Sequence, residues 1–136
     1  MYKSIIITLI AAFALPALAN QSEISKLYSD YLTEQKKFLA GTYTRQNIAE
    51  KIVPFEKMAN ETYEKITALE ANEKLELSKE GTQLALEGEL LTPLSTLAKS
   101  SMTVDDCGAN LSEAAANGDD EVMGAFVLKT LKKLCK

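Results

Sequence analysis

Residues 103–135 read TVDDCGANLSEAAANGDDEVMGAFVLKTLKKLC, which is the pattern of two helices joined by a tight turn. Thr103 is a favourable N-cap residue, and Asn117-Gly118 is a common helix end because glycine adopts the left-handed conformation without strain. We expect Asp119 or Asp120 to cap the second helix. Helical spacing predicts the inner faces as Val104, Cys107, Leu111 and Ala114, then as Val122, Phe126, Thr130 and Leu134 beside Met123, Val127 and Leu131. This stretch should therefore fold as an antiparallel helical hairpin.

Residues 1–19 have the parts of a secretory signal peptide. A positive charge precedes an apolar run at residues 5–15, which is too short to span a bilayer, and Pro16 is expected to break the helix. Ala17-Leu18-Ala19 fits a cleavage site, although an uncleaved anchor helix is the alternative. We therefore expect a cleaved signal peptide and a single helical domain, residues 20–136, in the periplasm or outside the cell.

The predicted export bears on the oxidation state of the two cysteines, because cysteines in an oxidising compartment usually pair. We expect a disulfide between Cys107 and Cys135, with two free thiols as the alternative, and a contribution of about 3.5 kcal/mol to stability. Cys107 lies ten residues before the end of its helix at Asn117, and Cys135 lies seventeen after Gly118. Straight helices would leave a height difference of about 10 Å, more than the roughly 7 Å that a disulfide spans. Unwinding after Leu131, a steep crossing or a bent helix would each close the gap.

Helical spacing continues through the rest of the chain, and no alternating stretch is long enough to predict a strand. A first helix is expected over residues 22–40, with Gly41 as its stop. A second should follow a cap at Thr42 or Thr44, and Pro54 either kinks that helix or starts a new one.

A third helix is expected from a cap at Asn72 to Leu91, and Thr92-Pro93 predicts the start of a further short helix. The apolar stripe of the third helix would consist of Leu77, Gly81, Leu84, Gly88 and Leu91. Each glycine costs about 1 kcal/mol inside a helix, so the pair marks either a close helix crossing or a break. The sequence therefore predicts an all-α fold, an irregular bundle of five to seven helices tied by one disulfide near the C-terminus.

The chain contains no histidine and no tryptophan, and no C-x-x-C, P-loop or G-x-G-x-x-G motif. The lack of histidine excludes Ser-His-Asp triads, histidine-bearing zinc sites and Glu-x-x-His di-iron sites. The net charge is −4, and loss of Lys3 with the signal peptide would make it one unit more negative. An acidic surface argues against nucleic acid and anionic membranes. We expect no enzyme, no cofactor, no metal ion and no stable membrane insertion after signal removal.

Carboxylates and tyrosines remain as candidates for a site. Glu73, Glu76, Glu80 and Glu87 lie at helical spacing, and a carboxylate pair can serve acid–base chemistry or hold a cation. Because glutamate is a good helix former, we expect instead a solvated face away from the Leu77 stripe. The segment NGDDE at residues 117–121 lacks the spacing of a calcium loop and is better explained as a turn with a helix cap.

By elimination, the favoured function is a protein-binding module, an inhibitor or immunity-type protein that neutralises or escorts another protein, for which a basic partner would suit the acidic chain. Tyrosine is enriched at interfaces, although core packing is the alternative for each aromatic residue. The candidate partner-binding residues are Tyr28, Tyr31, Tyr43, Glu73, Glu76 and Glu80. Two other functions are considered: a bundle that binds a small apolar ligand or lipid in a cavity, and an acid-activated chaperone whose carboxylates neutralise at low pH.

Overall fold

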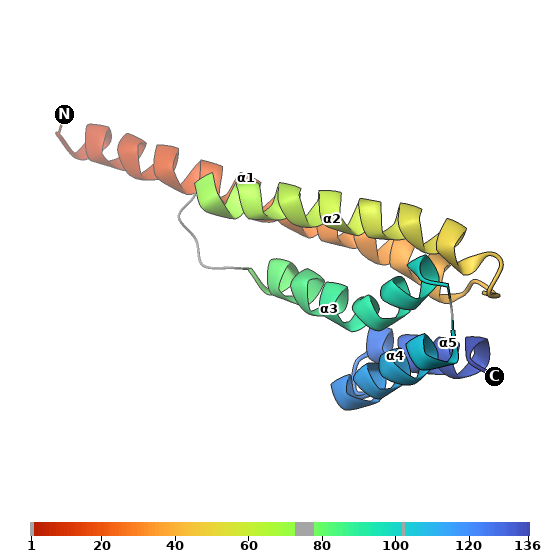
Figure 1. Cartoon of the computed structure of the whole chain (residues 1–136). Helices are drawn as coiled ribbons and strands as arrows, with labels where there is room; N and C mark the ends of the chain where they lie inside the picture. The colour runs from red at the N-terminus through yellow and green to blue at the C-terminus, as the bar shows by residue number, and fades with distance from the viewer. Residues whose placement is uncertain (1, 73–77, 102) are drawn as a thin grey trace.

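A computed structural model describes residues 2–72, 78–101 and 103–136, and it confirms the predicted all-α bundle (Figure 1). The described part contains five helices: α1 (Tyr2–Leu39), α2 (Ile48–Asn72), α3 (Lys79–Lys99), α4 (Val104–Asn117) and α5 (Val122–Leu134). The long helices α1 and α2 lie side by side and antiparallel, and α4 and α5 form the predicted hairpin (Figure 1). Because α3 packs against each of the other four helices, it is the centre of the bundle.

Helix α1 begins at Tyr2 and continues through Pro16, so the prediction that Pro16 breaks the helix was wrong. A proline removes one backbone hydrogen bond and favours a bend, but the flanking alanines and leucines are strong helix formers. The N-terminal part of α1 projects beyond the bundle (Figure 1). No helix in the described ranges is both long enough and apolar enough to cross a membrane.

The turn between α1 and α2 is fixed by side chains. Thr44 and Asn47 cap each other, since the Thr44 N–H donates to Asn47 Oδ1 at 2.8 Å and the Asn47 N–H donates to Thr44 Oγ1 at 3.2 Å. Helix α1 ends at Leu39, close to the predicted stop at Gly41, and Gly41 does not have a positive φ. A Cβ atom at Gly41 would lie 2.5 Å from the hydroxyl oxygen of Tyr43. Glycine is therefore needed here because the Tyr43 ring approaches the backbone.

Helix α2 remains one helix through Pro54, which lies on the exposed side. Of the two alternatives for Pro54, the structure therefore excludes a new helix start. The inner face of α2 contains Ile48, Ile52, Phe55 and Ile66, which are all buried. At the far end of α2, the buried Glu70 carboxylate accepts hydrogen bonds from the N–H and hydroxyl groups of Ser78. This contact connects the end of α2 to the start of α3.

The N-cap of α3 is Ser78 rather than the predicted Asn72, and its hydroxyl oxygen accepts from the Gly81 N–H at 3.0 Å. Thr92-Pro93 does not start a helix as predicted, because α3 runs without a break to Lys99. The Thr92 hydroxyl instead donates to the Gly88 carbonyl at 3.1 Å. Pro93 is buried within the helix, and α3 bends in this part of the bundle (Figure 1).

The predicted glycine stripe of α3 was wrong at Gly88. Gly81 is buried in the first turn of α3, whereas Gly88 is exposed and a Cβ there would meet no atom within 4 Å. Gly88 therefore marks neither a close crossing nor a break. Leu77, which began the predicted stripe, lies outside the described residues.

The hairpin has the predicted caps at two of its three boundaries. Thr103 and Asp106 form a capping box at the start of α4, and Gly118 ends α4 with a φ of 82°. Helix α5 begins later than predicted, at Val122, after the N-cap residue Glu121 and not after Asp119 or Asp120.

The predicted inner faces of the hairpin are confirmed only in part. Val122 is 69% exposed and Val104 is 89% exposed, so neither belongs to the predicted core face. The four deeply buried apolar side chains of α5 are Met123, Val127, Leu131 and Leu134.

The later start of α5 also explains how the disulfide closes. Cys107 lies ten residues before the last residue of α4, and Cys135 lies thirteen residues after the first residue of α5. The remaining difference of three residues corresponds to about 4.5 Å of helical rise. Cys107 and Cys135 are bonded, with their Cα atoms 5.7 Å apart, as predicted. The four residues between the two helices therefore remove most of the expected mismatch.

Six aromatic rings form a continuous chain through the core, which we call the aromatic chain. Its members, in spatial order, are Tyr28, Tyr31, Phe55, Phe38, Tyr43 and Phe126. The closest pair, Phe38 and Phe55, stacks with centroids 4.2 Å apart and rings inclined by 5°. Because the chain joins α1, α2 and α5, it contributes contacts between three helices.

Candidate functional site

The most unusual polar contact in the core joins Tyr31 of α1 to Glu87 of α3. The two residues are 2% and 7% exposed, and the Tyr31 hydroxyl donates to Glu87 Oε2 at 2.5 Å. Gln35 Nε2 donates to the same hydroxyl oxygen at 3.3 Å. Burial and the bond to Glu87 raise the pKa of Tyr31 well above its ordinary value. A buried carboxylate is costly unless it accepts hydrogen bonds, so Tyr31 is the group that allows Glu87 to lie here.

Gln83 extends this buried contact to the surface. Its Nε2 atom lies 3.3 Å from Glu87 Oε1 and 3.2 Å from Glu121 Oε2, so one amide group donates to two carboxylates. Glu121 is exposed and is the N-cap residue of α5. The network therefore joins α1, α3 and the connection between α4 and α5.

Tyr28 lies at the edge of this network. Its half-buried ring stacks on Tyr31, with centroids 6.0 Å apart and an angle of 28° between the rings. Burial raises the pKa of Tyr28, and the negative charges of Glu87, Glu80 and Glu121 raise it further. Glu87 is buried, so Glu80 and Glu121 are the members of this group that reach the surface. We call Tyr28, Glu80, Glu87 and Glu121 the acidic tyrosine patch.

No lysine or arginine neutralises the acidic tyrosine patch within the described ranges. The two ion pairs found there lie elsewhere, between Lys37 and Glu34 and between Lys99 and Glu56. In the sequence, residues 104–128 contain six carboxylates and no basic residue. Asp119 and Asp120 are exposed next to Glu121. None of the described lysine or arginine residues therefore forms an ion pair with the patch.

The structure brings together only some of the predicted partner-binding residues. Tyr28 and Glu80 both belong to the acidic tyrosine patch. Tyr31 lies beneath it in the core, and Tyr43 lies at the opposite end of the aromatic chain, where its hydroxyl donates to the Phe38 carbonyl. The burial of these two rings favours the alternative role in the core. Glu73 and Glu76 lie outside the described residues.

The placement of Glu87 on a solvated face was wrong, and helix phase explains the error. A step of three residues from the buried Leu84 leads to Glu87, and a further step of four leads to the buried Leu91. A step of four residues from Leu84 leads instead to Gly88. The stripe predicted through Gly88 contained no charged residue, so it was preferred. The spacing of Leu84, Glu87, Leu91 and Leu94 was the signal that could have identified Glu87 as inward-facing.

The patch is suited to recognition of a cation. Tyr28 in the patch and Tyr31 beneath it both hold their protons firmly, because their pKa values are raised. Across the part of the chain that the structure describes, no three His, Cys, Asp or Glu side chains gather closely enough to hold a metal ion. Clustered negative charge beside an aromatic ring is instead the arrangement that attracts lysine and arginine side chains.

Comparison with protein-family models, with curated proteins and with solved structures gave no match to this chain. The acidic tyrosine patch must therefore be interpreted from its own chemistry.

Proposed function

We propose that this chain is an exported protein-binding module that takes up a basic partner protein on the acidic tyrosine patch. A module of this kind would act as an inhibitor or immunity-type protein, which neutralises or escorts its partner. The observation that carries the proposal is the Gln83 amide group that links the buried Glu87 to the exposed Glu121 beside the Tyr28–Tyr31 ring pair. Complementary charge speeds association and selects partners, and a tyrosine ring offers apolar contact area beside it.

The hydrogen bonds beneath the acidic tyrosine patch also favour binding of a partner protein. The Tyr31–Glu87 contact and the bridging amide of Gln83 fix the positions of the buried groups before any partner arrives. A surface that is already ordered loses less conformational entropy on association. Val122, next to Glu121 and 69% exposed, supplies apolar area at the edge of the patch. Charge, an aromatic ring and apolar area together resemble the composition of an interface.

A paired neutralisation tests the proposal. The test variant is Glu80→Gln/Glu121→Gln, and the matched control is Glu61→Gln/Glu64→Gln, which removes two exposed carboxylates from α2. Wild-type protein and the control should retain the same basic partner at one-to-one stoichiometry from periplasmic extract. The test variant should bind the purified partner about tenfold more weakly, and added salt should reduce the difference. The proposal fails if no stoichiometric partner is retained, or if both variants weaken binding equally.

The compartment is a separate part of the proposal. It rests on the signal-like pattern of residues 1–19 and is compatible with the Cys107–Cys135 disulfide, since such bonds persist in oxidising compartments. Mass spectrometry of the protein from cell fractions should find a chain that begins at Asn20 in the periplasm or medium. A full-length chain confined to the cytoplasm would contradict export while leaving the patch itself to be tested.

A further inference from the structure

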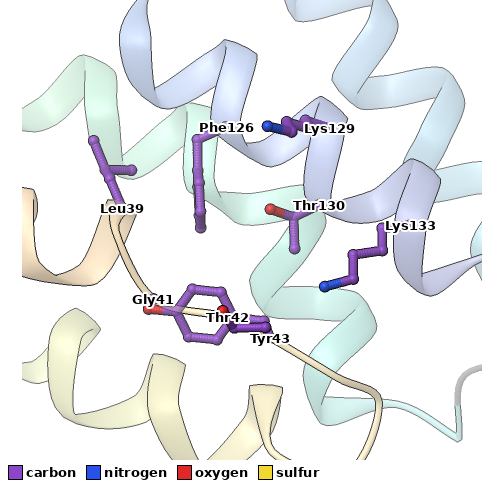
Figure 2. A pocket seen from close by; sticks show the side chains of 8 residues that line it. All are labelled: Leu39, Gly41, Thr42, Tyr43, Phe126, Lys129, Thr130 and Lys133. Atoms are coloured by element: carbon purple, nitrogen blue, oxygen red, sulfur yellow. The ribbon is translucent and has the colours of Figure 1, made fainter.

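The end of the molecule opposite the acidic tyrosine patch contains a cavity of about 220 Å³. It lies between the turn that follows α1 and one side of α5, and Figure 2 shows the side chains that line it. The turn contributes Gly41, Thr42 and Tyr43, and α5 contributes Phe126, Thr130 and two lysines. This cavity is separate from the proposed partner surface, so an inference about it does not depend on the proposed function.

The apolar part of the cavity is aromatic. Tyr43 and Phe126 meet edge to face, with centroids 5.8 Å apart and an angle of 83° between the rings, and Leu39 lies beside them. The Tyr43 hydroxyl is already bonded to the Phe38 carbonyl. Tyr43 therefore offers its ring rather than its hydroxyl to the cavity, and two rings at right angles favour contact with a further aromatic ring.

The polar part of the cavity contains the hydroxyl group of Thr130. Thr130 is 7% exposed, and in the described part of the chain its hydroxyl makes no hydrogen bond. Four other helical threonines donate to the carbonyl four residues earlier, at 2.9–3.1 Å: Thr33, Thr62, Thr67 and Thr92. Thr130 lines the cavity instead (Figure 2). The Thr130 hydroxyl makes no bond to the backbone of α5, so it can donate to a ligand in the cavity.

Two unpaired lysines stand beside that hydroxyl. Lys129 and Lys133 are exposed, lie one turn apart on α5 and both line the cavity. Neither forms an ion pair or hydrogen bond with another described residue. Like charges four residues apart on a helix repel each other, so an anion between them would remove an unfavourable interaction. Lysine ammonium groups and a threonine hydroxyl are together suitable donors for a carboxylate.

We propose that this cavity binds a small aryl carboxylate. The aromatic ring of the ligand lies against Tyr43, Phe126 and Leu39, and its carboxylate accepts hydrogen bonds from Lys129, Lys133 and Thr130. The size of the cavity limits the ligand, because sites for drug-sized molecules occupy about 300–1,000 Å³. A cavity of about 220 Å³ suits one ring and excludes a nucleotide or a long acyl chain.

Titration of the full processed chain with benzoate tests the proposal, with chemical shifts of Phe126 and Thr130 as the readout. Benzoate should bind saturably in the millimolar range. Lys129→Gln/Lys133→Gln should weaken binding about tenfold, and Thr130→Val should weaken it several-fold, since each removes donors to the carboxylate. The matched control is Lys132→Gln/Lys136→Gln, which removes two exposed lysines outside the cavity and should leave binding unchanged.

Two further probes test the contributions of the aromatic ring and of the carboxylate separately. Benzyl alcohol keeps the ring without the charge, and acetate keeps the charge without the ring, so both should bind more weakly than benzoate. The proposal is overturned if benzoate does not saturate, if acetate binds as tightly, or if the control variant loses as much affinity as Lys129→Gln/Lys133→Gln. The paired lysine variant changes only surface residues, so its folding can be verified by thermal melting before the titration.

Discussion

The two ends of the aromatic chain bury the same kind of residue in opposite electrostatic surroundings. At one end, Tyr31 donates to the carboxylate of Glu87, and further carboxylates lie above it. At the other end, Tyr43 donates to a neutral carbonyl, and Lys129 and Lys133 lie nearby. Both tyrosines are at most 7% exposed. The hydrogen-bond partner, rather than the degree of burial, therefore distinguishes the two regions.

Helix α5 accounts for much of this separation, because it contributes to both ends. Glu121 is at its N-terminus and belongs to the acidic tyrosine patch, whereas Lys129 and Lys133 lie in its C-terminal half. A helix favours negative charge at its N-terminus and positive charge at its C-terminus. Arg45, from the α1–α2 turn, also donates to the Leu134 carbonyl at the C-terminal end of α5. One helix thus carries an acidic surface and a basic surface in the order that its dipole favours.

The largest predicted effect is loss of the disulfide, which anchors the basic end of α5. Replacing Cys107 and Cys135 with serine should lower the free energy of unfolding by about 2–4 kcal/mol, because the unfolded chain is no longer restricted. Urea denaturation measures the loss, and amide hydrogen exchange should increase most at residues 131–135. Val122→Ser is the control in the same hairpin, and as an exposed change it should cost about 0.5 kcal/mol or less. An unchanged midpoint in the double serine variant would show that packing alone holds α5.

The second prediction compares the two tyrosine hydroxyls directly. Tyr31→Phe should cost about 1.5–3 kcal/mol, because it removes a hydrogen bond to a buried carboxylate. Tyr43→Phe should cost about 0.5–1.5 kcal/mol, because its acceptor is a neutral carbonyl. The two substitutions remove the same atom from similarly buried rings, so each is the control for the other in urea denaturation. Equal losses would contradict the distinction between the two ends.

The sequence predicted those parts of the fold that depend on local chemistry. Thr103, Gly118 and the two cysteines all act as their residue types suggested, since capping and chain reversal depend on neighbours a few residues away. Pro16 and Pro93 did not break their helices as expected. Pro93 is buried in the helix that packs against all the others, so its contacts offset the lost hydrogen bond. Such contacts come from distant parts of the chain and have no local signal.

The candidate site was predictable only in part for the same reason. Tyr28 and Glu80 were identified from residue type, and the charge of Glu80 raises the pKa of Tyr28. Glu87 was missed because its hydrogen-bond partner, Tyr31, is 56 residues away in the sequence. Burial of Thr130 was expected from helix phase, but the cavity that it lines depends on the turn that faces α5. Helix phase shows which side chains face inward and does not show what they meet.

A third prediction uses pH to sharpen the contrast at Tyr31. Burial and Glu87 raise the pKa of Tyr31 in the folded state, so the folded protein resists deprotonation while the unfolded chain ionises near pH 10. The contribution of protonated Tyr31 to the free energy of unfolding is complete below about pH 10. It is lost as the pH rises further. Tyr31 should account for a loss of about 1.4 kcal/mol by about pH 11. Urea denaturation across this range should give a shallower decline for Tyr31→Phe than for wild type, and identical slopes would contradict the role of Tyr31.

The smallest predicted effect concerns two glycines whose replacement should change stability in opposite directions. Gly88→Ala should raise the free energy of unfolding by about 0.5–1 kcal/mol, because alanine favours the helix and a Cβ there meets no atom within 4 Å. Gly41→Ala should lower it by about 1 kcal/mol or more, because its Cβ would lie 2.5 Å from the Tyr43 hydroxyl oxygen. Thermal unfolding of both variants measures the two signs. A loss at Gly88 would mean that α3 has a neighbour on that side, and a gain at Gly41 would mean that the Tyr43 ring can move away from the turn.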